Sequence, residues 1–342
     1  MTMPVVKVAV DIMGGDNAPD AILMGVNEAL KMYGNKLQLL LVGPEERISA
    51  KLKELGIYGD SRLEIVNATQ VVEMSEHPAQ AYRNKRDSSI TVCMEMARQK
   101  RADAVFSAGN TGAAVTSAYF KWRMLPGIER PGIATMFPTE GKPFLLLDSG
   151  ATVDCTPVNL LHYALMGSIY MSSVQKRKNP RVGLLCNGTE EGKGNKLVQD
   201  AYQLLKRADG INFIGNVEGH GLFSGDVDIV VCDGFVGNVV LKSGEQLAIA
   251  MQHLIKRSIM KKLMWKLGAM LVKGAFVEFR KQTDYSEIGG APLLGVGGVC
   301  IIGHGISDAK AVRNGIRLAG DFVRQHVNET IADKVKALEL IK

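Results

Sequence analysis

The sequence contains little cysteine, and none of it is spaced as metal or redox sites are. Its 342 residues include five cysteines, an odd number, with no C-x-x-C pair and no cysteine/histidine ligand spacing. Several lie inside apolar runs (the five are Cys93, Cys155, Cys186, Cys232 and Cys300). Free thiols in apolar runs are typical of a reducing compartment. We therefore expect reduced core thiols and a cytoplasmic location.

Long apolar runs and targeting segments are also missing. No stretch is long enough to span a bilayer, and Met1–Asp11 has the pattern of a strand rather than of a signal peptide. With 46% hydrophobic and 22% charged residues, the chain has ample material for a core. Because no linker interrupts it, we expect one catalytic domain over residues 1–342.

Two nucleotide-binding motifs are absent. Gly295–Cys300 fails the G-x-G-x-x-G pattern at its last glycine, and Gly192–Lys196 is a glycine-lysine loop rather than a P-loop. Dinucleotide and nucleoside triphosphate sites are therefore weak interpretations. We expect no cofactor.

What the sequence does contain is an alternation of short apolar runs and amphipathic stretches. Strands are expected at Val5–Val10, Leu37–Val42, Leu63–Asn67, Ala104–Phe106, Arg181–Cys186, Ile211–Ile214, Val227–Cys232 and Val299–Ile302, with an antiparallel pair at Ile133–Phe137 and Pro143–Leu147. Helices are expected between them, for example from Pro19 to about Tyr33 and from about Thr156 to Met171. This order predicts an α/β fold with a mostly parallel sheet and helices on both faces.

One strand–turn–helix joint, Ala104–Val115, is unusually rich in glycine and short polar side chains. Asn110 or Thr111 is positioned to cap the following helix, whose free N–H groups would form an anion site. The glycines allow close approach of another molecule. Ordinary capping of a turn is the alternative interpretation.

The same pattern recurs at other strand ends. Apolar runs lead into Asp11, Ser107, Asp148–Gly150, Asn187–Thr189, Asn216–Glu218, Asp233 and His304, most of them beside glycine. Polar residues also simply fill turns. Their recurrence nevertheless favours one cleft at the carboxyl edge of one sheet, where open α/β sheets bind ligands.

The side chains in this expected cleft suit a compact phosphate. They are short hydrogen-bond donors, glycine turns and one cation (Ser88, Ser89, Ser107, Gly109, Asn110, Thr111, Gly112, Thr189, Lys193 and Asn195). Ser88 and Ser89 could equally be helix caps, and Lys193 a solvated loop residue.

Metal and covalent chemistry are less favoured. Five carboxylates could hold a divalent cation (Asp11, Asp16, Asp148, Asp154 and Asp233), but capping and ion pairing explain them as well. His77, His220 and His304 share no ligand spacing, and no G-x-S-x-G elbow is present. We expect no required metal.

One segment, Leu254–Lys281, differs in composition from the rest. It carries eight cations (Lys256, Arg257, Lys261, Lys262, Lys266, Lys273, Arg280 and Lys281) against Glu278, a net +7 that leaves −1 for the remainder of a chain at +6. Leu263, Leu267 and Leu271 recur at four-residue spacing, next to Val272. Ser243 and Gln246 resemble a capping box. We expect a protruding helical arm over about 243–281.

Two uses of this arm are open. Its apolar side could pack on a second subunit. A basic amphipathic helix with Trp and Phe also suits an anionic membrane surface, where each nearby cation adds about 1 kcal/mol. We expect dimerisation and reversible membrane docking, and no nucleic-acid partner.

Several motifs together resemble one bacterial family. They are Asp11–Asp16, Lys85–Ser89, Ser107–Ala113, Gly188–Glu191 with Lys193–Asn195, Asn216–Glu218, Asp233–Asn238 with Leu241 and Lys242, and Gly289–Gly295 with His304 and Gly305. In this order, over nearly the whole chain, they resemble the acyl-ACP:phosphate acyltransferases (the PlsX family). Two departures are Thr152, where asparagine is expected, and Cys186-Asn187 in place of Asn-Ile.

The resemblance implies a fold, a subunit arrangement and a reaction. The fold would be a three-layer α/β/α sandwich similar to isocitrate and isopropylmalate dehydrogenases and to phosphotransacetylase, in a homodimer. Phosphate would attack the thioester of long-chain acyl carrier protein. The resulting acyl phosphate would pass to a membrane glycerol-3-phosphate acyltransferase for phospholipid synthesis.

Roles follow for the cleft residues. Phosphate is assigned to Ser107, Asn110, Thr111, Lys193 and Asn195, and the thioester to Lys85, Ser88, Asn238 and His304, with Asp233 orienting one of these. Positioned phosphate needs mainly a stabilised oxyanion to react. A metal- and NAD-dependent dehydrogenase and a non-enzymatic phosphate-sensing membrane scaffold are the alternatives.

Overall fold

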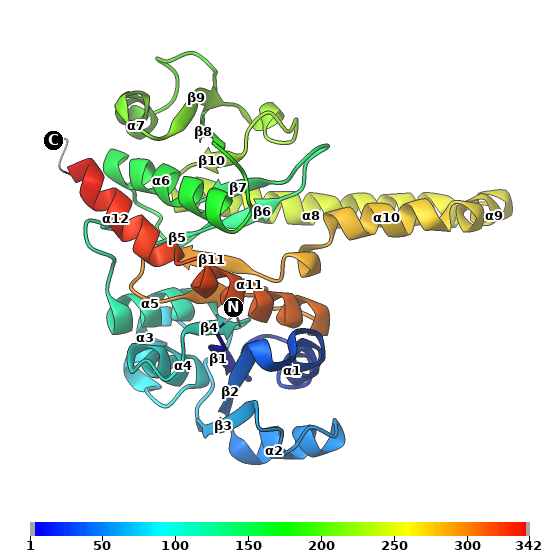
Figure 1. Ribbon diagram of the computed structural model, residues 1–342. Coiled ribbons are helices and arrows are strands. Elements are labelled where there is room, and N and C mark those ends of the chain that lie inside the picture. Colours follow the sequence, from blue (N-terminus) through cyan, green and yellow to red (C-terminus); the bar gives the residue numbers. More distant parts are fainter. Residues whose placement is uncertain (1–3, 340–342) are drawn as a thin grey trace.

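The computed structural model describes residues 4–339, without the side chains of residues 280–283, 285, 338 and 339 (Figure 1). Strands and helices alternate along the chain, and most neighbouring strands are parallel. The α/β class predicted from the sequence is confirmed.

The first sheet contains seven strands. Their spatial order is β3 (Leu63–Asn67), β2 (Leu37–Gly43), β1 (Val6–Asp11), β4 (Ala104–Ser107), β12 (Cys300–Ile302), β11 (Ala291–Leu294) and β5 (Gly132–Ile133). The first five run parallel, and β11 is antiparallel to both of its neighbours. Strand β11 was not expected, because Pro292 and the glycines before it hide its apolar pattern.

A second, five-stranded sheet corrects the prediction of one cleft on one sheet. Its order is β6 (Thr135–Phe137), β7 (Phe144–Leu147), β10 (Ile229–Val231), β8 (Arg181–Leu185) and β9 (Asn212–Val217). The expected strand Ile133–Phe137 is really two strands, since β5 pairs with β11 while β6 pairs antiparallel with β7. The chain thus passes from one sheet to the other at Ala134. The polar residues that follow the strands are therefore divided between two sheets.

Helices cover the two sheets (Figure 1). The first sheet is covered by α1 (Asp20–Tyr33), α2 (Glu45–Glu54), α3 (Pro78–Asn84), α4 (Ser89–Arg98), α5 (Thr111–Trp122) and α11 (Ala309–Arg324), and the second by α6 (Pro157–Ser173), α7 (Lys196–Arg207) and α12 (Val327–Glu339). Phe106, Tyr163 and Phe322 are fully buried in one cluster that includes residues of both sheets. Each such side chain stabilises the fold by about 1.5–3 kcal/mol.

Three further helices extend away from the sheets: α8 (Gly234–Ile259), α9 (Leu263–Leu271) and α10 (Lys273–Thr283) (Figure 1). Helix α8 begins at Gly234, because Asp233 accepts a hydrogen bond from the N–H of Val236 at 2.9 Å. The prediction that Ser243 opens this helix is therefore wrong. Helix α9 lies at the tip, where Leu263 is 72% and Leu271 88% exposed. None of the described helices is both long and apolar enough to cross a bilayer.

Candidate active site

A buried Ser–Asp pair lies where β1 and β4 end. Because these strands run parallel, with Val10 opposite Phe106, the residues that follow them meet. The Ser107 hydroxyl donates to Asp11 Oδ2 at 2.7 Å, and the N–H of Gly109 donates to Ser107 Oγ at 3.2 Å. Burial raises the pKa of Asp11, against hydrogen bonds from Ser89 and Ser107 that lower it. The pair fixes the turn that precedes α5.

Glycines let three loops come together around this pair. A Cβ on Gly14 would lie 2.7 Å from the nitrogen of Gly109, and Gly15, at φ +104°, leaves only 2.9 Å between such an atom and the oxygen of Gly305. The N–H of Asp16 donates to that same Gly305 oxygen at 2.8 Å. Loops after β1, β4 and β12 are thus packed backbone to backbone, which only glycine allows at these positions.

Asn110 organises the N-terminus of α5. Its Oδ1 accepts from the N–H of Ala113 at 3.0 Å, which confirms the predicted cap. Its amide nitrogen donates to the carbonyls of Glu73, Met74 and Glu76 at 3.0–3.2 Å. Asn110 therefore ties the loop 71–76 to the start of the helix.

The next two residues leave donors free. Thr111 is exposed, and within residues 4–339 no group accepts from the N–H of Thr111 or of Gly112. A Cβ on Gly112 would lie 2.4 Å from Cγ of Pro78, so only glycine fits there. These N–H groups lie at the positive end of the helix dipole and favour an anion.

Lys85 and Ser88 lie on the adjacent segment. The Lys85 ammonium donates to the carbonyl of Val71 at 2.7 Å and pairs with Glu76. This hydrogen bond lowers the pKa of Glu76. Ser88 precedes α4 without capping it, and its hydroxyl donates to Thr91 Oγ1 at 2.8 Å. Lys85 and Asn110 both hold the loop 71–76.

A cavity of about 490 Å³ separates this loop from the loop after β1. Its lining is formed by two short segments (Met13, Gly15, Asp16 and Ala18; Val71, Val72, Glu73, Met74 and Ser75). Its walls combine backbone with apolar side chains such as those of Met13, Val71 and Met74.

His304 follows β12, and its partner was not predicted. Nε2 of His304 lies 3.7 Å from Oε1 of Glu245 on α8. Interaction with Glu245 raises the pKa of His304, partly offset by burial. Glu245 lies far along the chain in an ordinary amphipathic helix, so no sequence signal could have found it.

The loop after β7 connects the two sheets. The buried Asp148 carboxylate accepts from the N–H groups of Ile133, Gly150, Ala151 and Thr152 at 2.7–3.0 Å. Ile133 belongs to the first sheet, and Asp148 follows strand β7 of the second. The Asn238 side chain lies against Gly150, whose added Cβ would be 3.5 Å from Asn238 Cβ.

The other predicted residues of the second sheet act locally. Asp233 caps α8, and Asn195 caps α7 by accepting from the N–H of Val198 at 3.0 Å. Thr189 and Lys193 are exposed on the loop after β8. Within the described residues, no hydrogen bond or ion pair joins Thr189, Lys193 or Asn195 to the loops of the first sheet.

Comparison with known proteins decides the family. Residues 6–330 match the family model described as "Fatty acid synthesis protein". The chain is 47% identical over 334 residues to the phosphate acyltransferase of Pelotomaculum thermopropionicum, covering 98% of this chain and 96% of that one. It is 46% identical over 328 residues to that of Dictyoglomus turgidum, covering 96% and 97%. The chain belongs to the phosphate acyltransferase family.

Solved structures support the fold. A phosphotransacetylase from Streptococcus pyogenes matches with a TM-score of 0.64 at 15% identity, covering 93% of this chain and 94% of that one. A branched-chain phosphotransacylase from Enterococcus faecalis matches with a TM-score of 0.59 at 14% identity, covering 93% and 99%. These structures show the fold, and the family shows the activity, which is acyl transfer to phosphate. In this phosphate acyltransferase the unusual Thr152 donates its hydroxyl to the carbonyl of Pro131 at 3.0 Å.

Proposed function

We propose that this enzyme transfers a long acyl chain from acyl carrier protein to inorganic phosphate, for phospholipid synthesis. The observation that carries the proposal is the N-terminus of α5. There, free N–H groups of Thr111 and Gly112 lie beside the buried Ser107–Asp11 pair, among loops that only glycine allows to meet. Such a terminus binds phosphate.

In this proposal Thr111 contacts phosphate directly, and Ser107 and Asn110 hold the surrounding backbone in place. Asn110 has its side chain fully engaged by Ala113 and the loop 71–76, so it positions rather than binds. Lys193 and Asn195 stay predicted ligands from the second sheet, on the loop that also carries Thr189.

The chemistry needs no redox step. A phosphate oxygen attacks the thioester carbonyl carbon, the C–O bond forms and the C–S bond breaks. The electron pair leaves with sulfur, which takes a proton from His304. Lys85 and Asn238 are the proposed donors toward the oxyanion, whose stabilisation is the main catalytic requirement. The buried Ser88, whose hydroxyl donates to Thr91, holds the segment that carries Lys85.

Trapping tests the reaction. Purified protein is incubated with palmitoyl carrier protein, phosphate and hydroxylamine, which converts acyl phosphate into a hydroxamate. Palmitoyl hydroxamate that forms faster with enzyme and phosphate together than by direct reaction of hydroxylamine with the thioester supports the proposal. Hydroxamate that forms equally without phosphate overturns it.

The helices α8–α10 fit a second part of the proposal, dimerisation and peripheral membrane association. Leu263, Leu267, Leu271 and Val272 are all at least half exposed, and Lys262 lies 4.7 Å from the ring of Trp265. A soluble protein gains little from such a surface unless something covers it. We propose that a second copy covers the α8 side and an anionic membrane the tip, where acyl phosphate reaches a membrane glycerol-3-phosphate acyltransferase.

The dehydrogenase-like α/β/α sandwich and the single catalytic domain remain part of this proposal. Both are consistent with a core that is continuous between the two sheets.

A further inference from the structure

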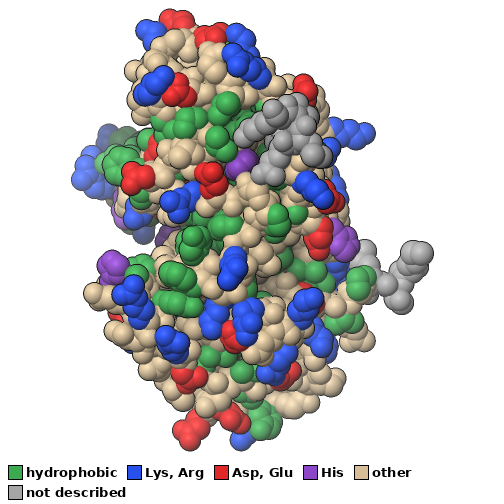
Figure 2. Space-filling model, turned by 90° about the vertical axis from the view of Figure 1, so that its left-hand side faces the viewer, with side chains coloured by type: hydrophobic (Ala, Val, Ile, Leu, Met, Phe, Trp, Pro, Cys, Tyr) green, Lys and Arg blue, Asp and Glu red, His purple; other side chains and the backbone are tan. Residues whose placement is uncertain are grey.

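A face built from α3, α4 and α5 carries many cations and, apart from Lys85 and the first residues of α4 and α5, lies outside the site described above. Residues 78–101 contain six cations (Arg83, Lys85, Arg86, Arg98, Lys100 and Arg101) against Asp87 and Glu95. Lys121 lies in the last turn of α5, and Arg123 is the first residue after this helix. Figure 2 looks onto this side of the molecule, and its lower half shows Lys and Arg side chains with hydrophobic ones between them.

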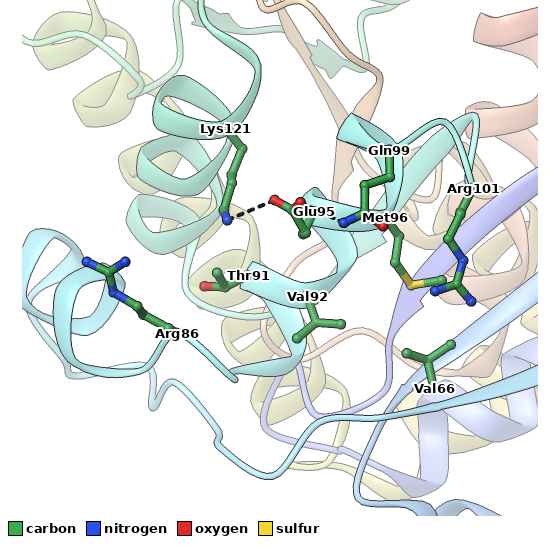
Figure 3. A pocket seen from close by; sticks show the side chains of 9 residues that line it. All are labelled: Val66, Arg86, Thr91, Val92, Glu95, Met96, Gln99, Arg101 and Lys121. Carbon is green, nitrogen blue, oxygen red and sulfur yellow. Dashed lines mark hydrogen bonds and ion pairs between the residues drawn. The ribbon is translucent and has the colours of Figure 1, made fainter.

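A cavity of about 230 Å³ crosses this face between α4, α5 and the end of β3 (Figure 3). Arg86 and Arg101 stand at its opposite ends, and its apolar lining comes from Val66, Val92 and Met96. The groove therefore offers apolar contact along its length and an arginine at each end.

The acidic residue of the lining does not cancel this charge. Glu95 Oε2 lies 2.9 Å from the ammonium of Lys121, and Arg98 pairs with the same carboxylate. Hydrogen bonds from Arg98, with those from Lys121, lower the pKa of Glu95 to about 2. Glu95 is thus matched by two cations. Arg101 pairs with Glu64 at 2.6 Å, but its side chain stays 51% exposed, and Arg86 has no ion-pair partner within the described residues.

An aromatic cluster lies along the other side of α5. The rings of Tyr82 and Phe120 stack at 5.0 Å, and Tyr119 meets Phe120 edge-on at 5.5 Å. Phe120 is 59% exposed. Exposed aromatics and arginines are among the residue types that dominate binding energy in protein interfaces.

This face is also close to the candidate active site. Helices α4 and α5 both begin there, at Ser88 and Asn110, and Thr91 in the cavity wall accepts from Ser88. The twelve residues of α5 rise about 18 Å. A partner docked along α5 would hold a tethered group within one helix length of Thr111. The face lies on the opposite side from α8–α10, so a dimer or membrane at those helices leaves it open (Figure 1).

We propose that the face of α3, α4 and α5 docks the acidic surface of the acyl carrier protein that delivers the thioester. Carboxylates of the carrier pair with Arg86 and Arg101, and an apolar side chain of the carrier contacts Phe120. Charge complementarity of this kind sets the rate and specificity of encounter. The inference rests on the proposed function, because it takes the carrier-bound thioester as the donor.

The test compares a double charge reversal, R86E/R101E, with a matched control elsewhere, R47E/R207E. Arg47 and Arg207 are exposed on α2 and α7, outside this face. Carrier affinity is measured by surface plasmon resonance, and turnover is measured with acyl carrier protein and with acyl-pantetheine, a thioester without a carrier. The milder R86Q/R101Q pair covers the case in which the reversal fails to fold.

We expect R86E/R101E to bind the carrier about tenfold more weakly or worse and to keep wild-type turnover with acyl-pantetheine, while the control binds as wild type does. Unchanged carrier binding in a folded R86E/R101E variant overturns the docking surface. An R86E/R101E variant that loses binding to anionic liposomes but keeps wild-type binding to the carrier also overturns it. Wild-type protein that makes no acyl phosphate from either donor instead contradicts the proposed function, and the affinity measurement still decides the docking surface.

Discussion

Thr111 begins α5 with an exposed hydroxyl and a free N–H group, and it makes no contact on which the fold depends. Replacing Thr111 by valine keeps the β-branched shape and removes only the hydroxyl. We predict that the phosphate KM rises about tenfold, since a hydrogen bond to a charged group contributes about 1.5–3 kcal/mol.

The thermal midpoint of T111V should stay near that of wild type. Thr116→Val, on the same helix, is the matched control and should leave phosphate kinetics unchanged. Wild-type phosphate kinetics in T111V would remove Thr111 from the anion site.

Asn110 shows how far sequence reasoning extends at a single residue. Its capping role was predictable, because a short polar side chain followed by small residues is a local pattern. Its three bonds to carbonyls of the loop 71–76 were not, since those carbonyls are 34–37 positions away and belong to no periodic element. A still larger separation in sequence concealed the pairing of Glu245 with His304.

His304 and Glu245 predict a pH effect. The carboxylate of Glu245 raises the pKa of His304, so Glu245→Gln should lower it toward 6.5. If His304 protonates the leaving sulfur, the alkaline limb of kcat/KM moves to lower pH in E245Q. The profile is measured from about pH 5.5 to 9.

Protonation of His304 also makes the stability of the fold depend on pH, in a defined direction. Because folding raises the pKa, protonated His304 stabilises the fold below its unfolded pKa, and this contribution is lost as pH rises through the folded pKa. The pH range over which this stabilisation is lost thus begins near 6.5 and extends upward. Glu329→Gln, which changes the exposed His326–Glu329 pair at 3.8 Å, is the control. An alkaline limb that does not move in E245Q would exclude His304 as the acid.

At the level of elements, the start of α8 is packed against the loop after β7. A Cβ on Gly237 would lie 1.8 Å from the carbonyl oxygen of Asp148, whereas one on Gly244 would lie 3.5 Å from Phe137. We predict that Gly237→Ala destabilises the protein by about 1–3 kcal/mol or more. Denaturant unfolding measures the difference.

Gly244→Ala is the matched control within the same helix. It should be neutral or stabilising by up to about 1 kcal/mol, because alanine has a higher helix propensity than glycine. Equal effects of the two substitutions would contradict the packing described at Asp148.

The same helix shows why its beginning was mispredicted. Ser243 and Gln246 fit a local capping pattern, but helix formation continues wherever backbone bonds are satisfied. Gly234 and Gly237 are poor helix formers, yet both are helical and buried against the Asp148 loop, where a side chain would not fit. Tertiary packing overrode local propensity.

The tip of the projecting helices yields a prediction about membranes. Leu271 is 88% and Val272 50% exposed, so L271D/V272D should not disturb the core. It should release the protein from anionic liposomes, because two apolar contacts are lost and negative charge is added.

Activity of L271D/V272D in the absence of membrane should persist. Val5→Asp with Met32→Asp, two exposed apolar positions on the first-sheet side, is the matched control. If L271D/V272D sediments with liposomes at the wild-type level, these helices do not bind the membrane through their tip and serve dimerisation only.

At the scale of the whole molecule, the positions of nearly all strands were predictable from apolar runs, but their division into two sheets was not. Strands β5 and β6 are separated by Ala134 alone and pair with different neighbours. Nothing local distinguishes such a crossing from a continuous strand. The candidate site was correspondingly predictable by residue type, while the distribution of its residues between two sheets was not.

That distribution makes the position of the bound anion the most direct test of the account. Arsenate has the shape and charge of phosphate, and its anomalous scattering locates it in diffraction from soaked crystals. The account predicts an arsenic peak at the N-terminus of α5, with oxygens within hydrogen-bond distance of the N–H groups of Thr111 and Gly112. An arsenic peak confined to the loop of Lys193 after β8, with none at Thr111, would contradict it.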